Sequence, residues 1–355
     1  MPELWYKLLD TFKTLPLTTE SLKFIESFAV TKEQQSKDIE WWKMILEDYL
    51  QRASIHEQPF IRAAACDCFA SMPQETFELF HYRHQRLIIT LLLSLVVDEN
   101  IHVKGAACRA LGIFILFPSL REDPMFVSDM AKSILSQKED KAILVRIRAS
   151  WAIANLCDAL VLESEKSDFN LREYMSTTEW IDLLSIVTTG AVDNEKLRSN
   201  AVRAIGSLLR ITPKEYFENT RMMSLVRNAI MQGLVKNIEA GTSLKIRWNA
   251  SHAASNMLLN PYFPIGDIYP WTNPLYQALI KALLHCKNFK VRINACLALT
   301  TPKKKSDYGN QLPIIVESIL EAWKICQENH GYKEVKYKEQ FEHQVRNYLC
   351  AHTHK

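Results

Sequence analysis

Glycine is scarce in this chain, with only 9 glycines among 355 residues. Proteins contain roughly 7% glycine on average, and helices tolerate little of it, so this scarcity predicts an all-α chain. It also leaves little material for the glycine-rich loops that cradle phosphates. A G-x-S-x-G elbow and an H-E-x-x-H helix are missing from the sequence as well. We therefore predict a chain that is not an enzyme, uses no cofactor and has no small-molecule substrate.

An excess of one charge and a long apolar run are missing too. The formal net charge is +3 over 355 residues, so no global field directs the chain to nucleic acid or to a membrane surface. The longest apolar stretch, 87–97, contains Thr90 and Ser94 and is too short to cross a bilayer. The first residues lack the basic and apolar regions of a signal peptide. These observations predict a cytoplasmic or nuclear protein without a membrane partner.

What the chain does contain is a phrase that occurs six times: an apolar residue, a basic residue, two free positions, Ala, two free positions and a small residue. Successive phrases begin 42, 42, 52, 49 and 45 residues apart. This interval is typical of HEAT or armadillo repeats, which stack helix pairs into a solenoid. We therefore predict an all-α solenoid of about six to seven helix pairs that forms a superhelical array. The phrases begin at residues 61, 103, 145, 197, 246 and 291.

The phrase is expected to form the inner helix of each pair, because its small residues recur with helical spacing, as Ala107 and Ala110 do. Gly112 and Gly206 extend this stripe of small residues by two positions. Outer helices are predicted before five of the phrases, at 85–97, 125–136, 178–192, 222–237 and 273–286. We divide the chain into an N-terminal helical cap, the repeat array and a degenerate C-terminal repeat, at 1–50, 51–310 and 311–355.

Three of the eight cysteines occupy one place in the phrase, directly after its first alanine: Cys66, Cys108 and Cys296. The other three phrases have Ser or Val at that place. A place that accepts Cys, Ser or Val is a small packing position, and a reduced cysteine packs as a small apolar group. We therefore predict buried free thiols there, and neither disulfides nor zinc ligands.

Several segments are more specific than a repeat consensus. They include Cys108-Arg109-Ala110-Leu111-Gly112, Ile246-Arg247-Trp248-Asn249-Ala250, Pro270-Trp271-Thr272 and Lys287-Asn288-Phe289-Lys290-Val291-Arg292. Through these segments, the region from about Ile39 to Gly309 resembles the C-terminal portion of the HEAT repeat-containing protein 6 family. Members of that family are longer at the N-terminus, so the chain resembles a truncated or divergent member. The resemblance implies a HEAT-repeat array and brings no defined biochemical activity.

The basic residue of each phrase, which we call the basic position, should recur along the stack as a ladder. One interpretation is structural: each side chain reaches an acid or the C-terminal carbonyls of a neighbouring repeat. The other is a basic track along the groove that binds an acidic partner. Asp98, Asp140 and Asp193 lie in short turns before three inner helices, where we expect them to cap backbone N–H groups. The six ladder residues are Arg62, Lys104, Arg146, Arg198, Arg247 and Arg292.

A second basic feature is the segment 281–305, which has seven Lys or Arg residues and no acid. Such a segment can bind a phosphate backbone with strong salt dependence, and its last three lysines resemble a weak nuclear-import signal. No set of base-stacking aromatics is interleaved with it, which favours a solvated surface over a nucleic-acid site. The candidate polyanion residues are Lys281, Lys287, Lys290, Lys303, Lys304 and Lys305.

Histidine-based metal sites have weak support in this sequence. Di-iron enzymes of HEAT-like fold, such as those resembling deoxyhypusine hydroxylase, use several His-Glu pairs, and this chain has one, His56-Glu57. His81 and His84 have the spacing to share a helix face, and 350–354 contains one Cys and two His. Without a second ligand cluster, these patterns are typical of surface residues. We predict no metal site.

Three functions follow from these patterns. The repeats and the missing catalytic motifs favour a non-enzymatic scaffold that binds proteins through its concave inner-helix surface. The alternative is RNA or DNA binding through the segment 281–305. A metalloenzyme is the third and the least favoured.

Overall fold

The computed structural model describes residues 11, 14–31, 38–328 and 335–353. Within these ranges all regular structure is helical and no strand occurs. The chain folds as two compact units, Met1–Glu163 and Ser164–Lys355, which we call unit 1 and unit 2. The boundary between them falls inside the array predicted at 51–310. No described helix is both long enough and apolar enough to cross a membrane.

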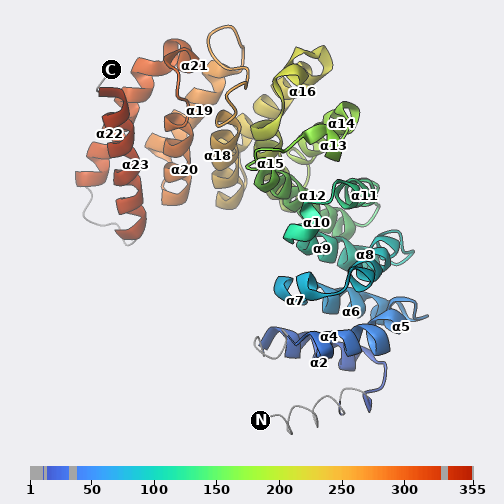
Figure 1. Cartoon of the computed structure of the whole chain (residues 1–355). Helices are drawn as coiled ribbons and strands as arrows, with labels where there is room; N and C mark the ends of the chain where they lie inside the picture. The colour runs from blue at the N-terminus through green and yellow to red at the C-terminus, as the bar shows by residue number, and fades with distance from the viewer. Residues whose placement is uncertain (1–10, 12–13, 32–37, 329–334, 354–355) are drawn as a thin grey trace. The chain divides into compact units, whose positions relative to one another are not determined.

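Unit 1 is built on a row of inner helices that pack side by side in chain order (Figure 1). These are α6 (Pro59–Ala70), α9 (Ile101–Phe114) and α12 (Ile143–Glu163). The helix α2 (Thr19–Thr31) packs against α6 and extends this row. Outer helices and short segments complete the described part of the unit: α4 (Ile39–Ile45), η1 (Leu46–Leu50), α5 (Gln51–Ser54), α7 (Gln74–Leu79), α8 (Tyr82–Val96), α10 (Pro118–Arg121) and α11 (Pro124–Leu135).

Unit 2 repeats this arrangement (Figure 1). Its inner row consists of α15 (Glu195–Ile211), α18 (Leu244–Leu258), α20 (Phe289–Thr300) and α23 (Val335–Thr353). Its outer helices are α14 (Thr177–Gly190), α16 (Thr220–Asn228), η3 (Ala229–Val235), α17 (Lys236–Ala240), α19 (Thr272–His285) and α22 (Leu312–Glu328). The short segments are α13 (Leu171–Tyr174), η2 (Lys214–Glu218), α21 (Lys305–Tyr308) and η4 (Gly309–Gln311).

The predicted helix pairs are confirmed. All six phrases lie on inner helices, and four of the five predicted outer helices match single observed helices. The fifth, predicted at 222–237, consists of α16, η3 and α17, because a π-helical segment interrupts the α-helical hydrogen bonds.

Small residues bring neighbouring inner helices into close contact, as their periodicity predicts. A Cβ atom on Gly206 of α15 would lie 2.5 Å from the Cα of Ala253 on α18. In unit 1, a Cβ on Gly112 of α9 would lie 3.0 Å from the Cα of Ala152 on α12. Both glycines are therefore needed for the helix approach, because a side chain there would meet backbone.

The cysteines within the phrases are packing residues, as predicted. Cys66, Cys108 and Cys296 are fully buried and not disulfide-bonded. Burial raises the pKa of Cys108 and of Cys296 to about 12. These thiols remain protonated at neutral pH, and a protonated thiol is a poor nucleophile and a poor metal ligand.

Candidate protein-binding groove on the inner helices

In the first two repeats of unit 1 the basic position joins neighbouring repeats. Arg62 on α6 donates from Nε and Nη2 to the two carboxylate oxygens of Asp98, at 2.8 and 2.9 Å. Lys104 on α9 makes the equivalent bond to the carboxylate of Asp140. Arg146 on α12 donates to the main-chain carbonyl of Asp140 at 2.8 Å. Asp98, Asp140 and Asp193 each accept a turn N–H, as expected, and the side-chain N-cap of α9 is Asn100, two residues after Asp98.

In unit 2 the basic position binds main-chain carbonyls. Arg198 donates to the carbonyl of Asp193, just after α14, at 2.8 Å. Arg247 and Arg292 donate from Nε to carbonyls of the preceding outer helices, α17 and α19, at 3.0 and 2.8 Å. Arg292 is only 5% exposed. All six head groups thus have partners within the chain. Arg62 and Lys104 reach the next repeat, as the structural interpretation expects, whereas the other four bind the turn or outer helix of their own repeat. The partner-track interpretation stays a prediction.

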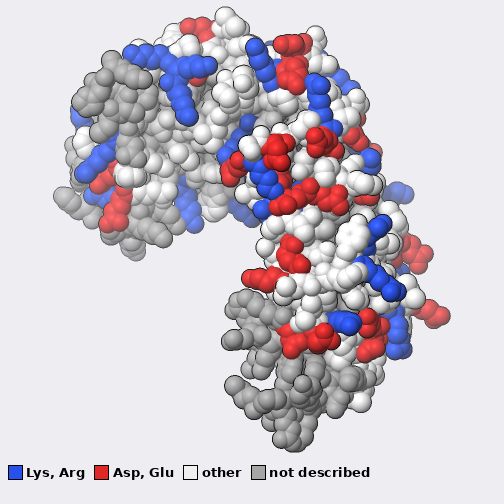
Figure 2. Space-filling view, viewed as in Figure 1, with Lys and Arg blue, Asp and Glu red and all other residues white. Residues whose placement is uncertain are grey.

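The lysines of segment 281–305 do not form one cluster. Lys287 and Lys290 lie at the start of α20, and the lysines 303–305 follow its end. A helix of 12 residues is about 18 Å long, so α20 separates the two groups. Figure 2 shows Lys and Arg side chains gathered where α21 lies. Polyanion binding by this segment stays a prediction.

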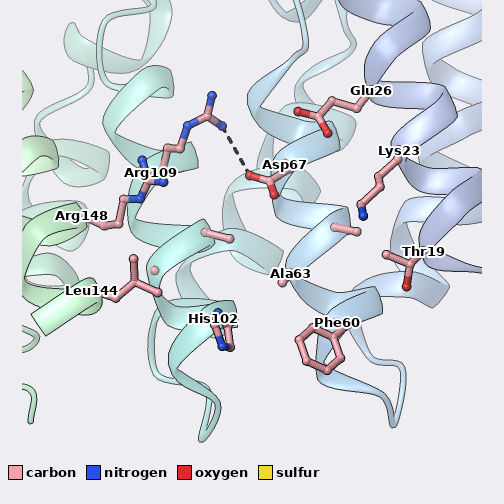
Figure 3. Close-up of a pocket in the computed structure, with 13 residues that line it drawn as sticks. Thr19, Lys23, Glu26, Phe60, Ala63, Asp67, His102, Arg109, Leu144 and Arg148 are labelled. Carbon is pink, nitrogen blue, oxygen red and sulfur yellow. Dashed lines mark hydrogen bonds and ion pairs between the residues drawn. The ribbon is translucent and has the colours of Figure 1, made fainter. Parts of the chain in front are cut away.

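A groove of about 300 Å³ lies on the inner face of unit 1, between α2, α6, α9 and the start of α12 (Figure 3). Its floor is made of the residues one and two places after the basic position: Ala63, Ala64, Gly105 and Ala106. Side chains of this size leave the space between the inner helices open. The groove therefore exists because two successive repeats have only Ala or Gly at these places.

The walls of this groove carry opposite charges. Glu26 on α2 and Asp67 on α6 lie on one side, and Arg109 on α9 and Arg148 on α12 on the other (Figure 3). Nη1 of Arg109 lies 3.4 Å from Oδ1 of Asp67, and the two side chains are 34% and 42% exposed. Lys23 also lines the α2 wall. The ion pair is long and partly solvated, so it leaves charge available to a ligand.

The negative charge of the acidic wall is only partly balanced by the nearby basic side chains. Burial raises the pKa of Glu26, and the charge of Asp67 raises it further. Burial also raises the pKa of Asp67, although Arg109 and Arg148 act in the opposite direction. A basic group placed between the two carboxylates would favour their ionised forms. This part of the groove is suited to a cationic side chain.

One end of the groove is apolar. Phe60 is 63% exposed, and its ring centroid lies 5.9 Å from that of His102 on the next inner helix. Leu144 on α12 continues the row. An aromatic side chain this exposed buries little surface within the fold, and aromatic residues are frequent anchors at protein interfaces.

The groove residues were not predicted from the sequence, although part of their pattern is visible in it. Phe60, His102 and Leu144 all stand two residues before the basic position, and each is the second residue of its inner helix. Aligning the six phrases on the basic position would have shown this row. The residues from α2 carry no such signal, because 1–50 lacks the phrase.

The histidines considered as metal ligands have other partners. Nε2 of His84 lies 3.1 Å from Oε1 of Glu47, and Nδ1 of His81 accepts a main-chain N–H at the start of α8. Among the residues that the structure describes, no group of three or more His, Cys, Asp or Glu is arranged to hold a metal ion. The side chains of 350–354 lie outside the described residues.

Sequence comparisons match the repeats. The family model for HEAT-like repeats matches residues 59–114, which run from α6 to α9. An uncharacterised protein of Dictyostelium discoideum is 26% identical over 414 residues. The match covers 86% of this chain and 27% of the Dictyostelium protein, so the chain spans about a quarter of that relative's length.

Comparisons with solved structures give the fold. A crystal structure of importin beta matches with a TM-score of 0.54 at 11% identity, over 94% of this chain and 44% of that one. A designed armadillo repeat protein in complex with the peptide (KR)4 matches with a TM-score of 0.50 at 18% identity, over 71% of this chain and 97% of that one. The chain therefore has the α-solenoid fold of HEAT and armadillo repeat proteins.

Proposed function

We propose that this HEAT/armadillo-type solenoid is a non-enzymatic scaffold that binds a polypeptide segment in the groove of unit 1. The observation that carries the proposal is the exposed Phe60 beside a floor of Ala and Gly, with opposite charges on the two walls. A groove with one apolar end and charged walls fixes both the position and the direction of a bound peptide.

The groove chemistry defines the bound segment. An apolar side chain packs against Phe60 and His102, and a basic side chain enters between Glu26 and Asp67. The arginines of the opposite wall bind main-chain carbonyls or an acid of the segment. Support for an extended peptide comes from the designed armadillo protein of the same fold, which is in complex with the peptide (KR)4.

We also infer a relationship to the C-terminal portion of the HEAT repeat-containing protein 6 family. It rests on the sequence segments between about Ile39 and Gly309. The Dictyostelium relative is much longer than this chain, as members of that family are. The inference adds no activity to the scaffold proposal.

Affinity purification of the tagged chain from the cells that express it, with nuclease treatment and mass spectrometry, tests the scaffold. The test variant is Phe60→Ala/Arg148→Glu. The control is Tyr82→Ala/Arg83→Glu on the outer helix α8, where Tyr82 is also 63% exposed. We expect a nuclease-resistant, stoichiometric protein partner that the test variant loses and the control keeps. A partner retained by both variants would contradict the groove, and recovery of only nuclease-sensitive proteins would contradict the scaffold.

A further inference from the structure

The inner face of unit 2 differs in chemistry from that of unit 1 at equivalent repeat positions. Two residues before the basic position, unit 1 has an aromatic, a histidine and a leucine, whereas unit 2 has a lysine in all three repeats. Each of these lysines is the second residue of its inner helix, and all three are exposed. This lysine row consists of Lys196 on α15, Lys245 on α18 and Lys290 on α20.

The lysine row does not serve the stability of its own helices. Backbone N–H groups at a helix start carry partial positive charge, so a cation in the first turn is disfavoured there. Three successive inner helices of unit 2 nevertheless have a lysine at this place. A repeated exposed charge that opposes helix stability points to an anionic ligand.

The neighbouring inner-face positions are suited to that ligand. The residues one, two and five places after the basic position include no acid in unit 2. Trp248, Lys290, Ile293, Asn294 and Gln340 line a second groove of about 240 Å³, between α18, α20 and α23. In it, the ammonium group of Lys290 lies 5.0 Å from the ring centroid of Trp248. One place after the basic position, unit 2 has Ser199, Trp248 and Ile293. Two places after it are Asn200, Asn249 and Asn294, and five places after it are Arg203, His252 and Leu297.

Acidic residues also lie near this surface. Glu195 directly precedes Lys196 and is exposed. Glu339 and Glu342 lie on α23, the helix that contributes Gln340 to the second groove. The three positions of the row are themselves cationic, and the acids lie beside them.

We infer that the inner face of unit 2 binds an acidic polypeptide in an extended conformation, with one carboxylate facing each lysine of the row. Packed helices lie about 8–10 Å apart, which sets the spacing of the row. An extended chain of the polyproline II type advances about 3.1 Å per residue and has three residues per turn, so every third side chain lies on the same side, about 9 Å apart. The bound segment therefore has acidic residues at every third position.

The spacing favours an acidic peptide over a nucleic acid. Phosphates follow one another about every 3.4 Å of helix axis along each strand of a duplex, so most of them would face no lysine. Stacking of bases on aromatic side chains is the usual second contribution to single-strand binding. Among the inner-face positions given above, the only aromatic rings are Trp248, which already contacts Lys290, and the imidazole of His252.

This inference does not rest on the groove of unit 1, because all of its residues belong to unit 2. Failure of one proposal leaves the other standing. The test therefore uses variants of unit 2 only and leaves Phe60 and Arg148 unchanged.

Fluorescence anisotropy with the full chain tests the inference. One labelled peptide has Glu at every third position among serines, and a second has the same composition with its glutamates consecutive. The test variant is Lys196→Gln/Lys245→Gln/Lys290→Gln. The control is Lys303→Gln/Lys304→Gln/Lys305→Gln, which removes the same charge from the same unit. Circular dichroism verifies that both variants are folded.

We expect the spaced peptide to bind more tightly than the consecutive one. The test variant should weaken that binding about tenfold, and the control less than about twofold. Equal loss in both variants, no preference for the spaced peptide or no binding at all would overturn the inference. Tighter binding of a single-stranded RNA that depends on the same lysines would overturn it in favour of a nucleic-acid site. If the triple variant folds poorly, each single Lys→Gln change is expected to weaken binding about twofold.

Discussion

Arg62 binds both carboxylate oxygens of Asp98, 36 residues further along the chain, at 2.8 and 2.9 Å. The two side chains are 12% and 9% exposed. The contact connects α6 to the turn that precedes α9, and Lys104 makes the same connection to Asp140 one repeat later. In the first two repeats of unit 1 this recurrent basic residue thus holds neighbouring repeats together.

Removing the acid of this pair should destabilise unit 1. We expect Asp98→Asn to lower the local free energy of unfolding by about 2 kcal/mol, because the nearly buried Arg62 loses its carboxylate partner and keeps only the carbonyls of His56 and Glu57. Hydrogen exchange in α6 and α9, followed by mass spectrometry, measures the change. Asp182→Asn is the control, since its pair with Arg221 is 2.8 Å long but more than half exposed. It should cost less than about 0.5 kcal/mol, and equal losses would contradict the structural role of Arg62.

Low pH should weaken the contact between Arg62 and Asp98. Burial raises the pKa of Asp98, but the hydrogen bonds from Arg62 and from the N–H of Asn100 lower it more, so the net pKa is below its ordinary value. Stability from this group is therefore complete above the unfolded pKa of about 3.9 and is lost as pH falls through the folded pKa. Thermal unfolding between pH 2 and 7 should show a smaller loss of stability in acid for Asp98→Asn than for the unchanged chain. Parallel pH profiles would contradict this assignment.

Two glycine substitutions should have opposite effects. Gly206→Ala places a Cβ 2.5 Å from the Cα of Ala253, and we expect a loss of about 1–3 kcal/mol from overpacking between α15 and α18. Gly105→Ala places its Cβ no closer than 3.6 Å to any side chain, so helix propensity should stabilise α9 by up to about 1 kcal/mol. Thermal unfolding of both variants measures the difference. A neutral Gly206→Ala would show that the inner helices are not in close contact there.

The ionised carboxylate of Asp67 in the acidic wall should lower the free energy of unfolding of unit 1. The pKa of Asp67 is raised mainly by burial, so the folded state loses stability as pH rises from about 3.9 through the folded pKa. We expect Asp67→Asn to stabilise unit 1 at pH 7 by less than about 1 kcal/mol, because the side chain is partly exposed. The same change should weaken binding of the partner in the groove. Denaturant unfolding at pH 4 and pH 7 tests this, and a loss of stability at pH 7 would show that Arg109 already compensates Asp67.

The inner helices could be predicted from the sequence because their packing restricts single residues. Gly112 and Gly206 stand where a larger side chain meets the backbone of the next helix, and the alanines of the phrase are buried. The basic position could be predicted as well, since it recurs with the repeat. Its partners differ along the chain, and only the structure distinguishes them. Arg62 and Lys104 bind carboxylates of the next repeat, whereas the four later basic residues bind main-chain carbonyls.

The groove could not be predicted, because it depends on helices that are distant in sequence. Lys23 and Glu26 come from α2, which lacks the phrase, and Arg148 comes from α12. Alanine at position 63 or 106 is an ordinary helix residue in the sequence, and it opens a groove only through its neighbours. The exposure of Phe60 likewise follows from the packing of α6 and α9 and not from local periodicity.

Site-specific photo-crosslinking tests the central claim most directly. The photoreactive analogue benzoylphenylalanine replaces Phe60 in one chain and Tyr82 in another, two aromatic positions that are each 63% exposed. After irradiation of cells that express each chain, mass spectrometry identifies the crosslinked proteins. The groove proposal predicts one prominent protein crosslink from position 60 and none to that protein from position 82. A crosslink to the same partner from position 82 alone would show that the partner binds the outer helices, and would contradict the account.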